Sequence, residues 1–215
     1  AFSPQLSGQL AGNGKLKGLL DGSRLAVNIN ELEGRVKDYP VSASGGVRLE
    51  SEQLFADKLQ LNVGKNQVSL NGQFNEASGV DWRIDAPELS VLSPELTGQL
   101  SGSGKAKGLL DGSRLAVEIT ELDGKVNGYP VTATGAVRIK DEQLFADNLR
   151  LSAGENLISL NGQANESEGI DWRIDAPKLS AFSPQLKGSL KGNGKATGLL
   201  DGSRLALNIE QLQGE

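Results

Sequence analysis

The sequence predicts an all-β protein, an elongated and curled antiparallel sheet built from tandem repeats. Three observations predict it. Apolar and polar residues alternate with a period of two, which is the spacing of side chains on one face of a strand. Glycine supplies 28 of the 215 residues, about twice its ordinary share of roughly 7%. The same segments also return at a constant interval, while the 3.6-residue spacing of a helix is nowhere sustained.

The repeat has a period of 90 residues, because Ser3-Pro4 returns as Ser93-Pro94 and as Ser183-Pro184. The segment 81–87 (DWRIDAP) recurs at 171–177 in the same register. No insertion separates the copies, and a constant register is what stacked repeats require.

We therefore expect a first copy at residues 1–90, a second at 91–180 and a partial third at 181–215. These copies would form one continuous elongated domain. Because the chain does not begin with Met and the third copy is incomplete, we expect it to be a segment of a longer protein.

Each period contains about six stretches of alternating residues, which predicts roughly fourteen antiparallel strands in all. Leucine and glycine share one face of the first stretch. In the second, the alternation slips before Leu32, which predicts a β-bulge. Turn residues separate the stretches, and a short turn is expected around residues 87–96. In the first copy the stretches are residues 6–20, 25–36, 41–49, 59–63, 68–74 and 80–86.

Composition excludes several functions. The chain has no Cys and no His, so it has no disulfide, no thiolate zinc site and no Ser-His triad. A net charge of −5 argues against a nucleic acid partner, whose binders carry a basic surface. We predict a protein that is not an enzyme and that uses no cofactor and no metal.

So many strands with one apolar face and no helices to cover them pose a problem of burial. One solution is a repeated β-sandwich, in which two sheets bury their apolar faces against each other. The other is a single sheet curled into a trough, whose apolar inner wall holds something other than protein. Alternating Leu and Gly in the first strand, at residues 6–20, would leave space and let the sheet bend, which favours the trough. Glycine that serves only curvature or close backbone approach is the alternative.

The residues expected to line the groove are the apolar positions of each strand, and in a sandwich the same residues would form a dry core. They are Leu25, Val27, Ile29, Val47, Leu59, Leu61, Val68, Leu70, Phe74, Val80, Trp82, Ile84, Leu115, Val117, Ile119, Val137, Leu149, Leu151, Ile158, Leu160, Ile170, Trp172, Ile174, Leu205, Leu207 and Ile209.

Three other motifs are interpreted as structural. Asp81 and Asp85 share a face with Arg83 between them, which indicates a solvated ladder of charges rather than an acid–base pair or a calcium site. The glycines of residues 10–15 lack the Lys-Ser/Thr pair and the following helix of a phosphate-binding loop. Tyr39 and Tyr129 are each followed by proline and are expected to cap a strand end at the groove rim.

The stretch Ser-Pro-x-Leu-x-Gly-x-Leu-x-Gly-x-Gly-Lys occurs at residues 3–15, 93–105 and 183–195, and Gly-Leu-Leu-Asp-Gly-Ser-Arg-Leu-Ala follows it. These motifs resemble the repeat region of the TamB and AsmA-like family of Gram-negative envelope proteins. The resemblance implies a β-taco with a hydrophobic interior that crosses the periplasm. It also implies a parent protein anchored in the inner membrane. Its outer-membrane barrel partner, similar to TamA, would dock on parts of the parent chain outside this segment.

From this resemblance and the apolar face we expect a periplasmic segment of a bridge-like lipid-transport protein. Its groove would carry the acyl chains of phospholipids between the inner and outer membranes, and nucleic acid is not an expected partner. Two alternatives stay open at this point. One is a scaffold for the assembly of outer-membrane proteins, and the other is a structural or adhesive surface repeat module.

Overall fold

The computed structural model describes residues 8–19, 24–36, 38–51, 53–165, 168–183, 185–198 and 206–215. Within these ranges the chain is all-β, with two short 3-10 turns and no α-helix. It divides into two compact units, residues 1–110 and residues 111–215, and each is described by itself.

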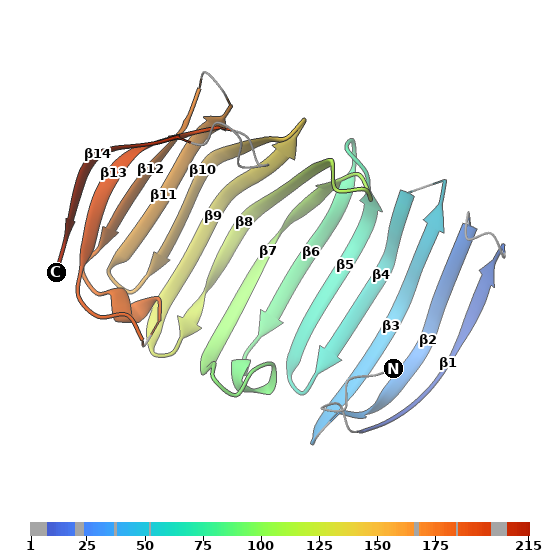
Figure 1. The fold of residues 1–215 in the computed structure, drawn as a ribbon. Coiled ribbons are helices and arrows are strands. Elements are labelled where there is room, and N and C mark those ends of the chain that lie inside the picture. The colour runs from blue at the N-terminus through green and yellow to red at the C-terminus, as the bar shows by residue number, and fades with distance from the viewer. Residues whose placement is uncertain are drawn as a thin grey trace. The chain divides into compact units, whose positions relative to one another are not determined.

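The first unit is an open antiparallel sheet of seven strands in chain order (Figure 1). A 3-10 turn, η1 (Leu89–Val91), lies in the connection between the last two strands. The strands are β1 (Gly8–Gly18), β2 (Arg24–Val36), β3 (Tyr39–Glu50), β4 (Gln53–Val63), β5 (Asn66–Phe74), β6 (Gly79–Ala86) and β7 (Gly98–Gly108).

The second unit repeats this plan, again with seven antiparallel strands in chain order. Its 3-10 turn is η2 (Leu179–Ala181). Its strands are β8 (Arg114–Val126), β9 (Tyr129–Lys140), β10 (Gln143–Ala153), β11 (Asn156–Ala164), β12 (Ile170–Ala176), β13 (Leu190–Thr197) and β14 (Ala206–Gly214).

The predicted bulge before Leu32 is confirmed. The pairing of β2 with β3 shifts between Ile29 and Leu32, and this shift returns the apolar residues on either side of it to one face. At the same level, the pairing of β1 with β2 shifts between Asn13 and Gly14.

A second bulge was not predicted. The pairing of β3 with β4 shifts between Ser44 and Gly46, where Gly45 has φ +107° and Lys58 has φ +47°. Apolar and polar residues alternate without a break through residues 41–49, so the sequence of β3 does not indicate this bulge. The pairing of β4 with β5 also shifts, between Ala56 and Leu59. Only residues 59–63 of this strand were predicted, so the shift lies just before the predicted stretch.

No second sheet covers either unit among the described residues, since each sheet consists of consecutive strands paired in chain order. Buried apolar residues in these ranges are small. Seven of the ten are alanine, and the others are Val80, Leu89 and Ile170. A sandwich core would instead be filled with large aliphatic side chains at crystal-like density. The sandwich alternative is therefore wrong, and the all-β curled open sheet is confirmed.

Candidate functional site

The apolar residues of consecutive strands stand opposite one another, so they form rows across each sheet. One row runs through a single face of the first unit at the level of Leu61, and an equivalent row crosses the second unit at Leu151. The first consists of Gly12, Leu32, Ala43, Leu61, Val68, Ile84 and Gly102. The second consists of Leu122, Ala133, Leu151, Ile158, Ile174, Gly192 and Leu212. We call the face that carries these rows the apolar face.

In each unit a neighbouring row contains one of the two tryptophans of the chain. Trp82 stands between Leu70 and Gly104, and Trp172 stands between Leu160 and Gly194. Because antiparallel partners point to the same side, both indoles belong to the apolar face.

Glycine beside the tryptophan makes room for the ring. A Cβ added to Gly194 would lie 2.8 Å from Cζ2 of Trp172, and one added to Gly192 would lie 3.4 Å from Cζ3. These two glycines let the indole ring lie close to the backbone of the neighbouring strand, and they do not leave empty space. The indole Nε1 of Trp172 is buried without a hydrogen-bond partner.

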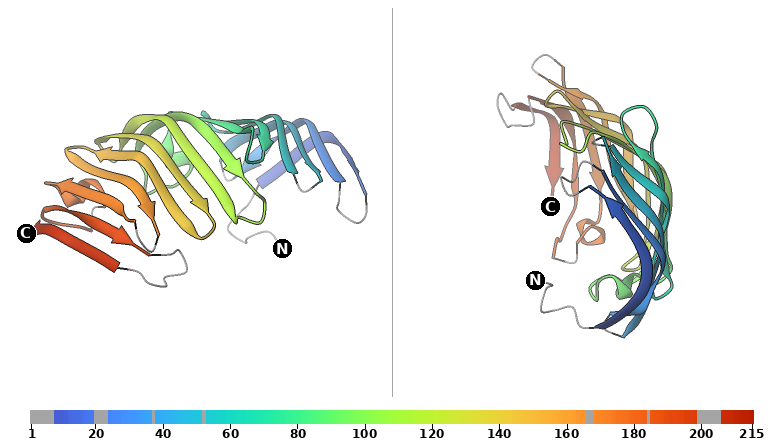
Figure 2. Two further views of the ribbon diagram at one scale, coloured as in Figure 1. Left: turned by 90° about the horizontal axis from the view of Figure 1, so that it is seen from above. Right: turned by 90° about the vertical axis from the view of Figure 1, so that its right-hand side faces the viewer.

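The connection after β6 lies against the apolar face. Asn66 stands opposite Val63 on that face and is 4% exposed. Its Nδ2 donates to the carbonyl oxygen of Glu88 (2.9 Å), and the N–H of Glu88 donates to its Oδ1 (3.0 Å). Figure 2 shows η1 on the concave side of its sheet. The apolar face is therefore the concave face.

Asn156 makes the same pair of hydrogen bonds to Lys178 in the second unit, at 2.7 Å and 3.0 Å. The sequence indicates a hairpin turn at residues 64–66 and does not predict this pair of hydrogen bonds, which we call the asparagine clamp. The signal available was an Asn two residues after a turn glycine in both copies, at 64–66 and 154–156.

Every predicted lining residue within the described ranges lies on the apolar face, and Leu205 lies outside them. Their exposure differs. Val80 and Ile170 are buried, at 7% and 5%, whereas Leu207 is 60% exposed. Leu10, Leu16 and Leu212 join the same face and were not among the predicted residues, although alternation indicated the first two. Contact of this set with lipid stays a prediction.

The opposite face, which we call the polar face, carries paired charges. Arg48 donates to both carboxylate oxygens of Asp57, at 2.6 Å and 3.2 Å, and lies 4.5 Å from the centre of the Phe55 ring. These hydrogen bonds, with a smaller coulombic attraction, hold the pKa of Asp57 below its ordinary value of 3.8. Arg138 and Asp147 repeat the pair at 2.7 Å and 3.2 Å.

Asp81 and its copy Asp171 form ion pairs with lysines of the next strand. Asp81 pairs with Lys105 at 2.6 Å and Asp171 with Lys195 at 3.2 Å. Both aspartates are exposed, which agrees with a solvated ladder of charges.

Tyr129 begins β9 at the end of the sheet where η2 lies, and its ring is 5.3 Å from the Lys178 ammonium. Hydrogen bonding with Ser180, and then with Lys178, lowers the pKa of the Tyr129 phenol. The tyrosine thus marks the strand end, as expected.

The described residues contain no group of His, Cys, Asp and Glu side chains that could hold a metal ion. In the same ranges no helix has the length and apolar character needed to cross a membrane.

An open sheet of tandem repeats with an uncovered apolar concave face defines a class of open β-repeat protein rather than a closed globular domain. The model of the family described as "TamB, N-terminal domain" matches residues 1–120 and 93–213. The chain therefore belongs to the TamB family and is a TamB-like protein of the cell envelope.

A curated relative is the translocation and assembly module subunit TamB of Haemophilus influenzae, 23% identical over 190 residues. The alignment covers 83% of this chain and 15% of the relative, so the chain spans a small part of the relative's length. No solved structure matches the chain.

Proposed function

We propose that the chain is a segment of a lipid conduit, in which the apolar face carries the acyl chains of phospholipids. The observation that carries this proposal is the pair of apolar rows through Leu61 and Leu151, which no other layer of the described chain covers. Each unit has large aliphatic side chains that are exposed on this face, such as Leu61 at 41% and Ile209 at 47%.

The energetic argument is one of transfer. Removing one CH₂ group from water contributes about 0.8 kcal/mol, so an acyl chain on a continuous apolar surface needs no specific contacts. Leucine, valine and isoleucine side chains provide that surface without polar groups that would fix a ligand in one place. A conduit requires such weak positional preference, because a closely fitting pocket would retain its cargo.

A photo-crosslinking amino acid in place of Leu70 or Leu160 tests the proposal in cells. We expect ultraviolet light to attach phospholipid to the protein at both positions, since both lie on the apolar face. Matched controls are Ser69 and Asn71, the residues on either side of Leu70, whose side chains point to the polar face. Equal lipid capture at the controls, or no lipid at the leucines, would contradict the proposal.

A second candidate is a scaffold for the assembly of outer-membrane proteins, which the name of the Haemophilus influenzae relative, a translocation and assembly module subunit, favours. In that case the same crosslinker at Leu70 would capture extended segments of client proteins rather than lipid. Mass spectrometry of the adducts separates the two candidates.

The proposal places this segment in the periplasm, within a parent protein anchored in the inner membrane and partnered by an outer-membrane barrel similar to TamA. Family membership supports this placement. The repeat copies at 1–90, 91–180 and 181–215 would each add a length of conduit, at about 4.8 Å per strand.

A further inference from the structure

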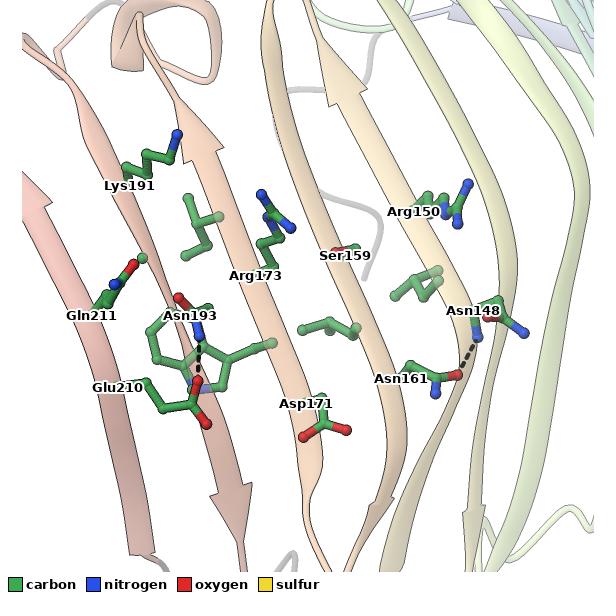
Figure 3. A pocket seen from close by; sticks show the side chains of 16 residues that line it. Asn148, Arg150, Ser159, Asn161, Asp171, Arg173, Lys191, Asn193, Glu210 and Gln211 are labelled. Carbon is green, nitrogen blue, oxygen red and sulfur yellow. Dashed lines mark hydrogen bonds between the residues drawn. The ribbon is translucent and has the colours of Figure 1, made fainter.

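The polar face of the second unit contains a pocket of about 610 Å³. Figure 3 shows its polar lining side chains, among them Arg150 and Arg173 on either side of Ser159. Register explains this arrangement. Arg150 stands opposite Ser159 on the neighbouring strand, and Ser159 stands opposite Arg173 on the next. The row continues to Asn193 and Gln211.

The two arginines are without an ion-pair partner among the described residues, whereas the other charged groups of the pocket are engaged. Lys191 lies 3.3 Å from Asp175, and Asp171 lies 3.2 Å from Lys195. Glu210 accepts a hydrogen bond of 2.5 Å from Nδ2 of Asn193 (Figure 3). A hydrogen bond from the neutral Asn193 amide does not cancel the charge of Glu210, so the two arginines leave the pocket with a net charge of +1.

The spacing of these charges suits an anion. Strands β10 and β12 are two strand spacings apart, about 10 Å, and the small Ser159 lies between them. Two long arginine side chains can converge over a serine from such positions, each presenting a planar fork that matches phosphate oxygens. The serine hydroxyl and the Gln211 amide add hydrogen-bond donors at the same level of the sheet.

The first unit lacks this arrangement at the same place in its repeat. There the row is Gln60, Ser69, Arg83 and Ser103. One arginine is kept, and glutamine stands where the second unit has Arg150. The strand pairing is the same in both units, so the difference lies in the side chains alone.

We propose that Arg150 and Arg173 form a binding site for a phosphate group on the polar face of the second unit. The site is independent of the acyl-chain proposal, because it lies on the opposite face of the sheet. A free phosphate and the headgroup of an anionic phospholipid both present the required oxygens.

The test uses the whole 215-residue chain with two probes, inorganic phosphate and vesicles. Backbone amide chemical shifts report phosphate binding, and co-sedimentation compares phosphatidylcholine vesicles with and without phosphatidylglycerol. We expect saturable binding of at least one probe. R150Q should weaken that binding at least tenfold, while circular dichroism stays unchanged because Gln60 already occupies this position in the first unit.

Two matched variants sharpen the result. R83Q removes the single arginine of the first unit and should leave binding unchanged, whereas Q60R should create a second site and double the stoichiometry. If R150Q weakens the binding of inorganic phosphate, the site is one for free phosphate. If it weakens only the binding of phosphatidylglycerol vesicles, the site is one for a lipid headgroup. Binding of neither probe, or equal loss with R83Q and R150Q, would overturn the proposal.

Discussion

The two units share the layout of the apolar face and differ at several positions of the polar face. On the apolar face the first unit has Leu61 and Trp82 where the second has Leu151 and Trp172. On the polar face Gln60, Ser101 and Ser103 correspond to Arg150, Lys191 and Asn193. The sheet needs only a continuous apolar surface within each unit. On its polar face, neutral and charged side chains can replace one another. Specific recognition can therefore be added to one unit without changing the fold.

The comparison is most informative at the bulge between β3 and β4 and at its copy between β9 and β10. Gly45 and its copy Gly135 have φ of +107° and +112°. A Cβ on Gly45 would lie 2.4 Å from the carbonyl oxygen of Lys58. The next residue is Gly46 in the first unit and Ala136 in the second, so only the first glycine is required by geometry.

We expect G45A and G135A to give the largest effect, a loss of about 1–3 kcal/mol from the backbone conformation alone, with the clash added. G46A is the control and should change the free energy of unfolding by less than about 0.5 kcal/mol, because Ala136 already occupies that position. Urea denaturation measures both. A G45A variant as stable as G46A would show that the bulge is not a requirement of the sheet.

The next effect concerns the asparagine clamp, which is equivalent in the two units. N66A or N156A removes two hydrogen bonds at a buried position and leaves two backbone groups unpaired. Each variant should lose about 2 kcal/mol, measured by urea denaturation. Gln67, which is exposed on the polar face beside Asn66, supplies the control Q67A. Similar losses in the free energy of unfolding for N66A and Q67A would mean that the clamp does not hold the connection after β6.

A smaller effect follows from Asp57. The pKa of Asp57 is lower in the folded protein than in the unfolded chain. Its contribution to stability is therefore fully present at a pH above the unfolded-state pKa, and it is lost as the pH falls through the folded-state pKa. D57N should therefore lower stability at pH 7 and make less difference at about pH 2, because the contribution of the Asp57 charge is lost as the pH falls. The effect is small because the Asp57 side chain is 50% exposed. A deficit of D57N that is equal at both pH values would contradict the assignment.

The smallest effect is local to Tyr129. Lys178 lowers the pKa of this phenol, and Glu88 occupies the equivalent position in the first unit. K178E should therefore raise the Tyr129 pKa toward its ordinary value of 10.0, although Ser180 still lowers it. Ultraviolet titration of the phenol measures this change. A pKa that does not move would show that Lys178 has no influence on the ring.

The strand order and the membership of the apolar face could be predicted from the sequence, because both follow from alternation and a constant register. The bulge at Leu32 was visible as a slip in that alternation. The bulge at Gly45 was not, since the residue that absorbs it lies on the partner strand. The clamp of Asn66 on Glu88 joins groups 22 residues apart, and neither residue type indicates such a contact. The row from Arg150 to Arg173 likewise appears only when three strands are placed in register.

The central claim, that the apolar face holds acyl chains, can be tested through the two native tryptophans. Both lie on that face, and the chain has no others. Phospholipid brominated on its acyl chains should quench the fluorescence of Trp82 and of Trp172, each measured in a variant that replaces the other with phenylalanine. Headgroup-brominated lipid should quench less. Full fluorescence of both tryptophans in the presence of lipid that co-purifies with the protein would contradict the account.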